Sequence, residues 1–259
     1  MLRAAMFAAI AQSALLVGAL LVWKFPRLTR PRTLGLIMAF GAGAVISALS
    51  TDLVAVSYDL AGAGPTAMGI AIGGLGYFLV IRWLEAKGAS ESPTEVVEVA
   101  EVANAEAPAA ATAAEARNIL VGMVIDGVPE SVSIGITLHT VGRAVSGALV
   151  GSVFVAGLPE AIGVAAAMLA GGIPLRRILL RFSGIVLIGA VAGALGYQAL
   201  VGADDRLIAL IQSIAAGALL VVVVNEMIPI AVRGAEKWAG VLAAAGFVFS
   251  AALTWASGG

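Results

Sequence analysis

The chain has 259 residues, of which 61% are hydrophobic and only 12% are charged, and its formal net charge is −1. This composition lies far outside the range of soluble globular domains and predicts a protein of the lipid bilayer. The balanced charge offers no basic surface to nucleic acid.

Apolar runs of about 20 residues, the length that crosses a bilayer as a helix, recur along the chain. The first run follows Arg3 but fills a whole bilayer, and no small-residue cleavage site follows Trp23, so we assign it as a span rather than a signal peptide. We expect an all-α polytopic membrane protein with a single domain, 1–259, and eight spans at 4–23, 33–56, 66–84, 118–138, 144–171, 178–201, 207–232 and 239–257.

The basic residues predict the orientation of these spans. All of them except Arg3, Arg143 and Arg206 fall into loops that share one side of the membrane. Because cytoplasmic loops hold the excess of lysine and arginine, we expect both termini to be external, in a plasma (inner) membrane.

One long hydrophilic break, residues 85–117, interrupts the apolar pattern on the predicted cytoplasmic side. It is rich in alanine, glutamate and valine, a composition typical of a solvated, flexible tether. The alternative is a weak cation-collecting tail, which no spacing in the segment requires.

A four-residue pattern, Gly-x-Pro-Glu, occurs in the fourth span and again in the fifth, ending at Glu130 and Glu160. A carboxylate near the bilayer midplane is costly and therefore functional by default, and no lysine or arginine lies deep in any span to pair with it. Asp126 lies four residues before Glu130 and hence on the same helical face. The three acids Asp126, Glu130 and Glu160 predict a cation site.

The prolines of these motifs, Pro129 and Pro159, have no N–H to donate, so each is expected to kink its helix and release a backbone carbonyl four residues earlier. Such a carbonyl is an additional hard ligand for a metal ion. Pro229 predicts a third kink, in the seventh span. The alternative for all three is a tolerated kink with no part in binding.

A second internal repeat supports a two-fold architecture. Ala-Gly-Ala at Ala42, followed after six residues by Thr-Asp52, matches Ala-Gly-Ala at Ala216, followed after six residues by Asn225-Glu226. The two spans run in opposite directions, as in an inverted repeat that relates helices 1–3 to helices 6–8 around a central pair, a 3+2+3 arrangement. We expect Asp52 and Glu226 to be outer and inner waystations of one path.

Two further polar residues of the fourth span are candidates for this path. His139 lies near its outer end, where a polar residue at the water boundary and a metal-capturing ligand are both compatible with the sequence. The Ser131 hydroxyl either faces the path or bonds to the preceding turn of its own helix.

Outside 85–117, the chain resembles the ZIP (Zrt/Irt-like) metal transporters. The segment 126–135, Asp-Gly-Val-Pro-Glu-Ser-Val-Ser-Ile-Gly, is similar to the family's His-Asn-x-Pro-Glu-Gly motif, and Glu226-Met-Ile-Pro229 also fits the family pattern. The resemblance implies uptake of divalent metal into the cytosol, an elevator-like or rocking cycle and a homodimer, with the metal as substrate and with no enzymatic activity or organic cofactor.

The chain departs from the family at the ligand positions. The family's histidine falls on Asp126 in the fourth span and on Ala156 in the fifth, and its asparagines fall on Gly127 and Gly157. Three carboxylates and no imidazole remain, which favours one site for a hard cation such as Mn²⁺ or Fe²⁺ over the Zn²⁺ that the resemblance implies.

Two other functions stay open at this stage. A transport-inactive, ZIP-like regulatory or interaction protein would explain the missing histidines. An intramembrane aspartyl protease would use Asp52 and Asp126 as a dyad, but the Gly-x-Gly-Asp signature is absent and Glu130 and Glu160 would have no role.

Overall fold

The structure, a computed structural model of the whole chain, describes residues 1–86, 113–140, 145–199 and 201–256. Within its helices some side chains also fall outside this description, among them four candidates from the sequence, Asp126, His139, Pro159 and Glu226. The described residues form helices joined by short turns and contain no strand, which confirms the all-α prediction for this part of the chain.

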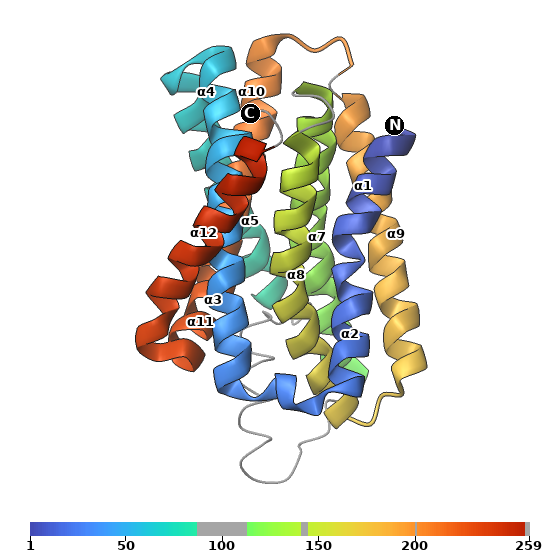
Figure 1. Cartoon of the computed structure of the whole chain (residues 1–259). Helices are drawn as coiled ribbons and strands as arrows, with labels where there is room; N and C mark the ends of the chain where they lie inside the picture. The colour runs from blue at the N-terminus through green and yellow to red at the C-terminus, as the bar shows by residue number, and fades with distance from the viewer. Residues whose placement is uncertain (87–112, 141–144, 200, 257–259) are drawn as a thin grey trace.

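In chain order, the helices are α1 (Leu2–Gln12), α2 (Ala14–Lys24), η1 (Pro26–Thr29), α3 (Pro31–Ala48), η2 (Leu49–Ala55), α4 (Val56–Ala61), α5 (Ala63–Ala86), α7 (Ala113–Thr140), α8 (Val145–Ala170), α9 (Leu175–Ala199), α10 (Asp205–Val222), η3 (Val223–Met227), α11 (Ile228–Ala235), η4 (Glu236–Trp238) and α12 (Ala239–Ala256). They stand side by side as an elongated bundle (Figure 1). The start of α1 and the end of α12 lie at the same end of this bundle.

Five helical segments of the described residues are long and apolar enough to cross a membrane: Leu2–Lys24, Pro31–Ala61, Ala63–Trp83, Leu175–Ala199 and Asp205–Ala256. The last has 52 residues, more than twice the roughly 20 that one crossing needs. This supports a membrane protein. The division into eight spans stays a prediction.

Three of these segments are interrupted rather than straight. The first breaks at Ser13, whose Oγ donates a hydrogen bond to the carbonyl of Ile10 at 2.6 Å; such a bond back to the preceding turn bends a helix. The other two contain π-helical segments, η2 with Asp52 and η3 with Asn225. η3 ends at Met227, two residues before Pro229, which has no N–H for the regular helical ladder. The kink expected at this proline stays a prediction.

Several helices approach each other so closely that only glycine, which has no side chain, fits at the crossing. A Cβ on Gly43 of α3 would collide with the carbonyl oxygen of Ala243 on α12, and a Cβ on Gly217 of α10 would collide with that of Ile70 on α5. Small residues at such crossings are the usual means of close helix packing in membranes. α3 therefore pairs with α12, and α10 pairs with α5.

The helices α2, α7, α8 and α9 share a second packed region. Leu15 of α2, Met123 of α7, Ala161 of α8 and Phe182 of α9 belong to one cluster of buried side chains. α7 passes through Pro129 as a single helix. This arrangement places both Gly-x-Pro-Glu motifs beside the break in the first segment.

Candidate functional site

A small cavity lies between the break at Ser13 and the two Gly-x-Pro-Glu motifs. Its lining includes Gln12 from α1, Glu130 from α7 and Glu160 from α8, and no lysine or arginine is among the described side chains that line it. Its volume is about 10 Å³, close to the space that holds one water molecule. A dehydrated metal ion also fits there, because metal–oxygen distances of about 2.0–2.6 Å are shorter than hydrogen bonds.

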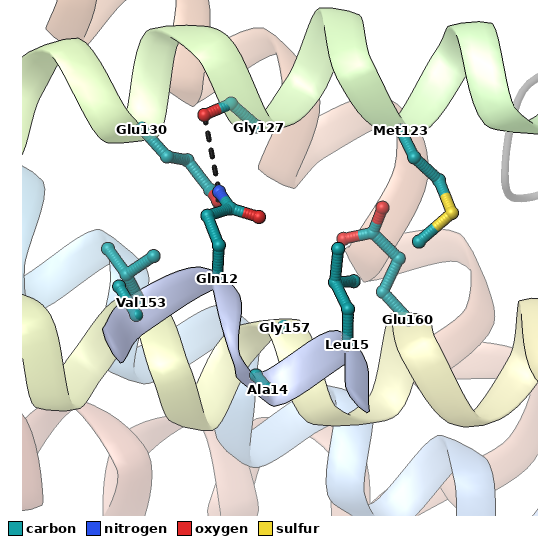
Figure 2. Close-up of a pocket in the computed structure, with 10 residues that line it drawn as sticks. Gln12, Ala14, Leu15, Met123, Gly127, Glu130, Val153, Gly157 and Glu160 are labelled. Carbon is teal, nitrogen blue, oxygen red and sulfur yellow. Dashed lines mark hydrogen bonds between the residues drawn. The ribbon is translucent and has the colours of Figure 1, made fainter. Parts of the chain in front are cut away.

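The two glutamates approach the cavity from different helices. Glu130 and Glu160 are each partly buried, and their side chains point into the space between α7, α8 and the first segment (Figure 2). The Glu130 carboxylate points toward Gln12, whereas the Glu160 carboxylate points toward Leu15 and Met123. Two of the three predicted ligands thus line one cavity.

Gln12 is the side chain that the sequence prediction missed. It is 5% exposed, and its Nε2 lies 3.2 Å from the Gly127 carbonyl oxygen, 3.4 Å from Glu130 Oε2 and 3.4 Å from Ser131 Oγ. An amide that donates to a carboxylate fixes the position of that carboxylate and partly offsets its charge. The signal in the sequence was an uncharged amide, next to Ser13, within an apolar span.

The glycines of the two motifs make room for the broken segment. A Cβ on Gly127 would lie 3.0 Å from Gln12 Nε2, and a Cβ on Gly157 would lie 3.3 Å from the Ala14 Cβ. Both glycines therefore allow close packing against the first segment. The packing in turn brings Gln12 into the cavity.

Ser131 is next to the hydrogen bonds that Gln12 donates to Gly127 and Glu130. It is fully buried, its Oγ is an acceptor within reach of Gln12 Nε2, and a Cβ on Gly189 of α9 would lie 2.8 Å from that oxygen. Ser133, two residues on, instead donates to the Pro129 carbonyl oxygen at 2.8 Å. Of these serines, Ser131 supports the site by contacting Gln12, and Ser133 bonds within its own helix.

Asp52 belongs to a different buried cluster and does not line the cavity. It is 1% exposed, its Oδ1 accepts from Thr51 Oγ1 at 3.1 Å, and its backbone carbonyl accepts from Gln212 Nε2 of α10 at 3.2 Å. Asp52 Oδ2 and Gln212 Oε1 have no hydrogen-bond partner in the part of the chain that the structure describes. Gln212 is the second residue that the sequence prediction missed.

The remaining candidates are placed only in part. Asn225 is exposed on η3. The side chains of Asp126, His139, Pro159 and Glu226 lie outside the described residues, so the position of Asp126 relative to the two glutamates stays a prediction. Among described side chains, no three acids or histidines gather closely enough to hold a metal ion by themselves.

Comparison with known proteins gives no functional assignment, so the function has to be argued from the residues of this cavity. No protein-family model matches the chain, and no curated protein matches it.

Proposed function

We propose that this protein carries divalent metal cations across the membrane through the cavity lined by Glu130 and Glu160. The observation that supports this most directly is the meeting of two acids from different helices in one small space, where no described lining residue is basic. In a membrane interior, two such carboxylates are tolerable when a cation or protons neutralise them.

The donor atoms suggest which metals are carried. The cavity offers carboxylate oxygens and the Gln12 amide, no histidine is among its described lining residues, and the sequence has no cysteine. Oxygen ligands suit Mn²⁺ and Fe²⁺, while zinc sites usually include nitrogen or sulfur. In the proposal, Asp126 supplies a third carboxylate one helical turn before Glu130.

The same proposal assigns the helices to the 3+2+3 arrangement of the ZIP family. Its support is a repeated contact: a Cβ on Gly246 of α12 would meet the Phe40 carbonyl oxygen on α3, as one on Gly73 of α5 would meet that of Ile214 on α10. Phe40 and Ile214 are separated by the same number of residues as Gly43 and Gly217. An inverted repeat that relates helices 1–3 to 6–8 makes these contacts equivalent.

The π-helical segments fit this symmetry as well. η2 and η3 begin at corresponding positions of the repeat, and each contains a polar pair, Thr51-Asp52 and Asn225-Glu226. π-helical turns occur frequently at functional sites. In the proposal, Asp52 and Glu226 remain waystations of the path on either side of the central cavity.

The direction and assembly follow from the resemblance and the charge pattern. The α2–α3 turn, the start of α9 and the end of α11 lie at one end of the bundle (Figure 1), and these segments hold Lys24, Arg27, Arg30, Arg32, Arg176, Arg177 and Arg233. We assign this end to the cytoplasm, with both termini external. Uptake into the cytosol by a homodimer is the family's behaviour and part of the proposal.

The test is metal uptake by proteoliposomes that contain the whole chain, with Mn²⁺, Fe²⁺ and Zn²⁺ compared directly. Uptake is expected to favour Mn²⁺ or Fe²⁺ and to be abolished by Glu130→Gln with Glu160→Gln. Asp205→Asn, which neutralises an exposed acid at the start of α10, is the matched control and should transport normally.

Two outcomes would overturn parts of the proposal. Zn²⁺ carried far better than Mn²⁺ would refute the oxygen-ligand argument. A correctly assembled protein that binds none of these metals would favour the transport-inactive regulator instead.

A further inference from the structure

A second, larger cavity lies at the end of the bundle where α3 begins and where α11 passes through η4 into α12. Its volume is about 420 Å³, and its lining includes three basic side chains, Arg32, Arg233 and Lys237, against one acid, Glu236. This charge repels a metal cation and attracts an anion. The cavity therefore has no part in the proposed transport chemistry.

The backbone around this cavity is held in place by close contacts. Gly234 near the end of α11 packs directly on α3, where an added Cβ would collide with the Pro31 carbonyl oxygen and lie 2.8 Å from the Gly35 Cα. Arg233 Nε also donates to the Pro229 carbonyl oxygen at 3.4 Å. The basic side chains thus start from a fixed junction between two helices.

The turn at Glu236 also belongs to the lining of this cavity. It is the one non-glycine residue of the described chain with a positive φ, 49°. L-residues rarely adopt that conformation, and it persists where the surroundings impose it, often at binding sites. The turn carries Lys237 and Trp238 past the beginning of α3, where they join Arg32 in the lining.

We propose that this cavity binds the phosphate group of an anionic phospholipid. Arginine and lysine together are suited to phosphate oxygens, arginine by paired hydrogen bonds and lysine by its compact charge. In the described residues neither Arg32 nor Lys237 lies within ion-pair distance of a carboxylate. Basic recesses between membrane helices on the cytoplasmic side are a known means of lipid recognition.

The neighbouring surface favours a lipid over a soluble anion. Trp238 is 50% exposed, and Val232 and Val241, on the helices either side of the cavity, are 54% and 59% exposed. Tryptophan is enriched at the level of lipid headgroups, and the exposed valines continue this surface along the helices as an apolar contact for acyl chains. A soluble phosphate would gain nothing from these side chains.

The experiment measures lipid binding to the purified full chain in detergent, with phosphatidylglycerol and phosphatidylcholine of the same acyl chains as probes. Native mass spectrometry counts the bound lipid, and a brominated phosphatidylglycerol reports contact through quenching of tryptophan fluorescence. We expect Arg32→Gln, Arg233→Gln and Lys237→Gln together to weaken phosphatidylglycerol binding about tenfold or more. Phosphatidylcholine binding should not change, and Trp238→Phe should remove most of the quenching.

The matched control removes three charges from the same end outside the cavity lining: Arg27→Gln, Arg30→Gln and Arg176→Gln. If this variant lost phosphatidylglycerol equally, the effect would be general surface charge and the proposal would be wrong. Inorganic phosphate and glycerol 3-phosphate form a further arm, and equal binding of these soluble anions would refute the assignment to a lipid. If the triple variant does not fold, the single changes Arg32→Gln and Lys237→Gln, both at exposed side chains, provide the same test.

Discussion

The two Gly-x-Pro-Glu motifs share one sequence pattern but meet different residues of the first segment. On α7, Gly127 and Glu130 both accept hydrogen bonds from Gln12. On α8, Gly157 packs on Ala14, and the Glu160 side chain points to the side of Leu15 (Figure 2). The difference arises in the first segment, where Gln12 ends α1 and Ala14 begins α2, on either side of the break at Ser13.

The contact with Gln12 affects how Glu130 binds a cation. A carboxylate that an amide donor holds in place is oriented before any cation arrives, which lowers the ordering cost of binding. We therefore regard Glu130 as the prepared ligand of the cavity.

The largest effect is expected from removing the amide. Gln12→Leu keeps a side chain of similar bulk but removes the hydrogen bonds that Gln12 donates to Glu130 and to the Gly127 carbonyl. Loss of a group that orients a metal ligand typically costs about tenfold to a hundredfold in affinity, and we expect metal binding to weaken by that amount. Isothermal titration with Mn²⁺ measures it.

Its control is Thr66→Ala on α5, outside the cavity lining. Thr66 is 4% exposed, and this change removes its hydrogen bond to the Gly62 carbonyl oxygen, four residues earlier. Unchanged affinity in Gln12→Leu, or an equal loss in Thr66→Ala, would show that the amide does not prepare the site.

The pH dependence of the metal affinity tests the proposal that both acids act as ligands. Protons and a metal compete for the same carboxylate oxygens, so metal binding releases protons and its affinity falls as pH falls. We expect an affinity loss of about tenfold between about pH 6 and 4, the range in which carboxylates ordinarily take up protons. Titration in two buffers of different ionisation enthalpy counts the released protons. A flat affinity over this range would exclude carboxylates as the principal ligands.

Paired alanine substitutions at the two glycines compare the motifs directly. Gly127→Ala places a methyl group 3.0 Å from Gln12 Nε2 and must displace the amide, whereas Gly157→Ala meets only the Ala14 methyl at 3.3 Å. The first should lower metal affinity about threefold, through a shift of a few tenths of an ångström, and the second should lower it less. A double-mutant cycle with Gln12→Leu decides the cause, because Gly127→Ala should have no further effect once the amide is gone.

How much of the fold and of the cavity could be predicted from the sequence depends on how far apart in the chain the contacting residues lie. Hydropathy and repeated motifs are local, so they identified the helical class and both cavity glutamates. Gln12 and Gln212 act through contacts with residues far along the chain, Gly127 and Asp52 respectively, and neither lies in a recurring motif. Only the packing of distant helices shows that these amides meet a carboxylate-bearing segment.

The smallest effect is expected at Asp52, where a second amide meets a second acid outside the cavity. Asp52→Asn keeps the shape and the carbonyl that accepts from Gln212, but removes the charge. If Asp52 is a waystation rather than a ligand, initial uptake should slow by about twofold because a cation loses one attractive charge on its path. Equilibrium binding at the cavity should not change, since Asp52 does not line it. Stopped-flow uptake, read beside titration of the same protein, separates the two quantities: a changed affinity would make Asp52 part of the binding site, and an unchanged rate would remove it from the path.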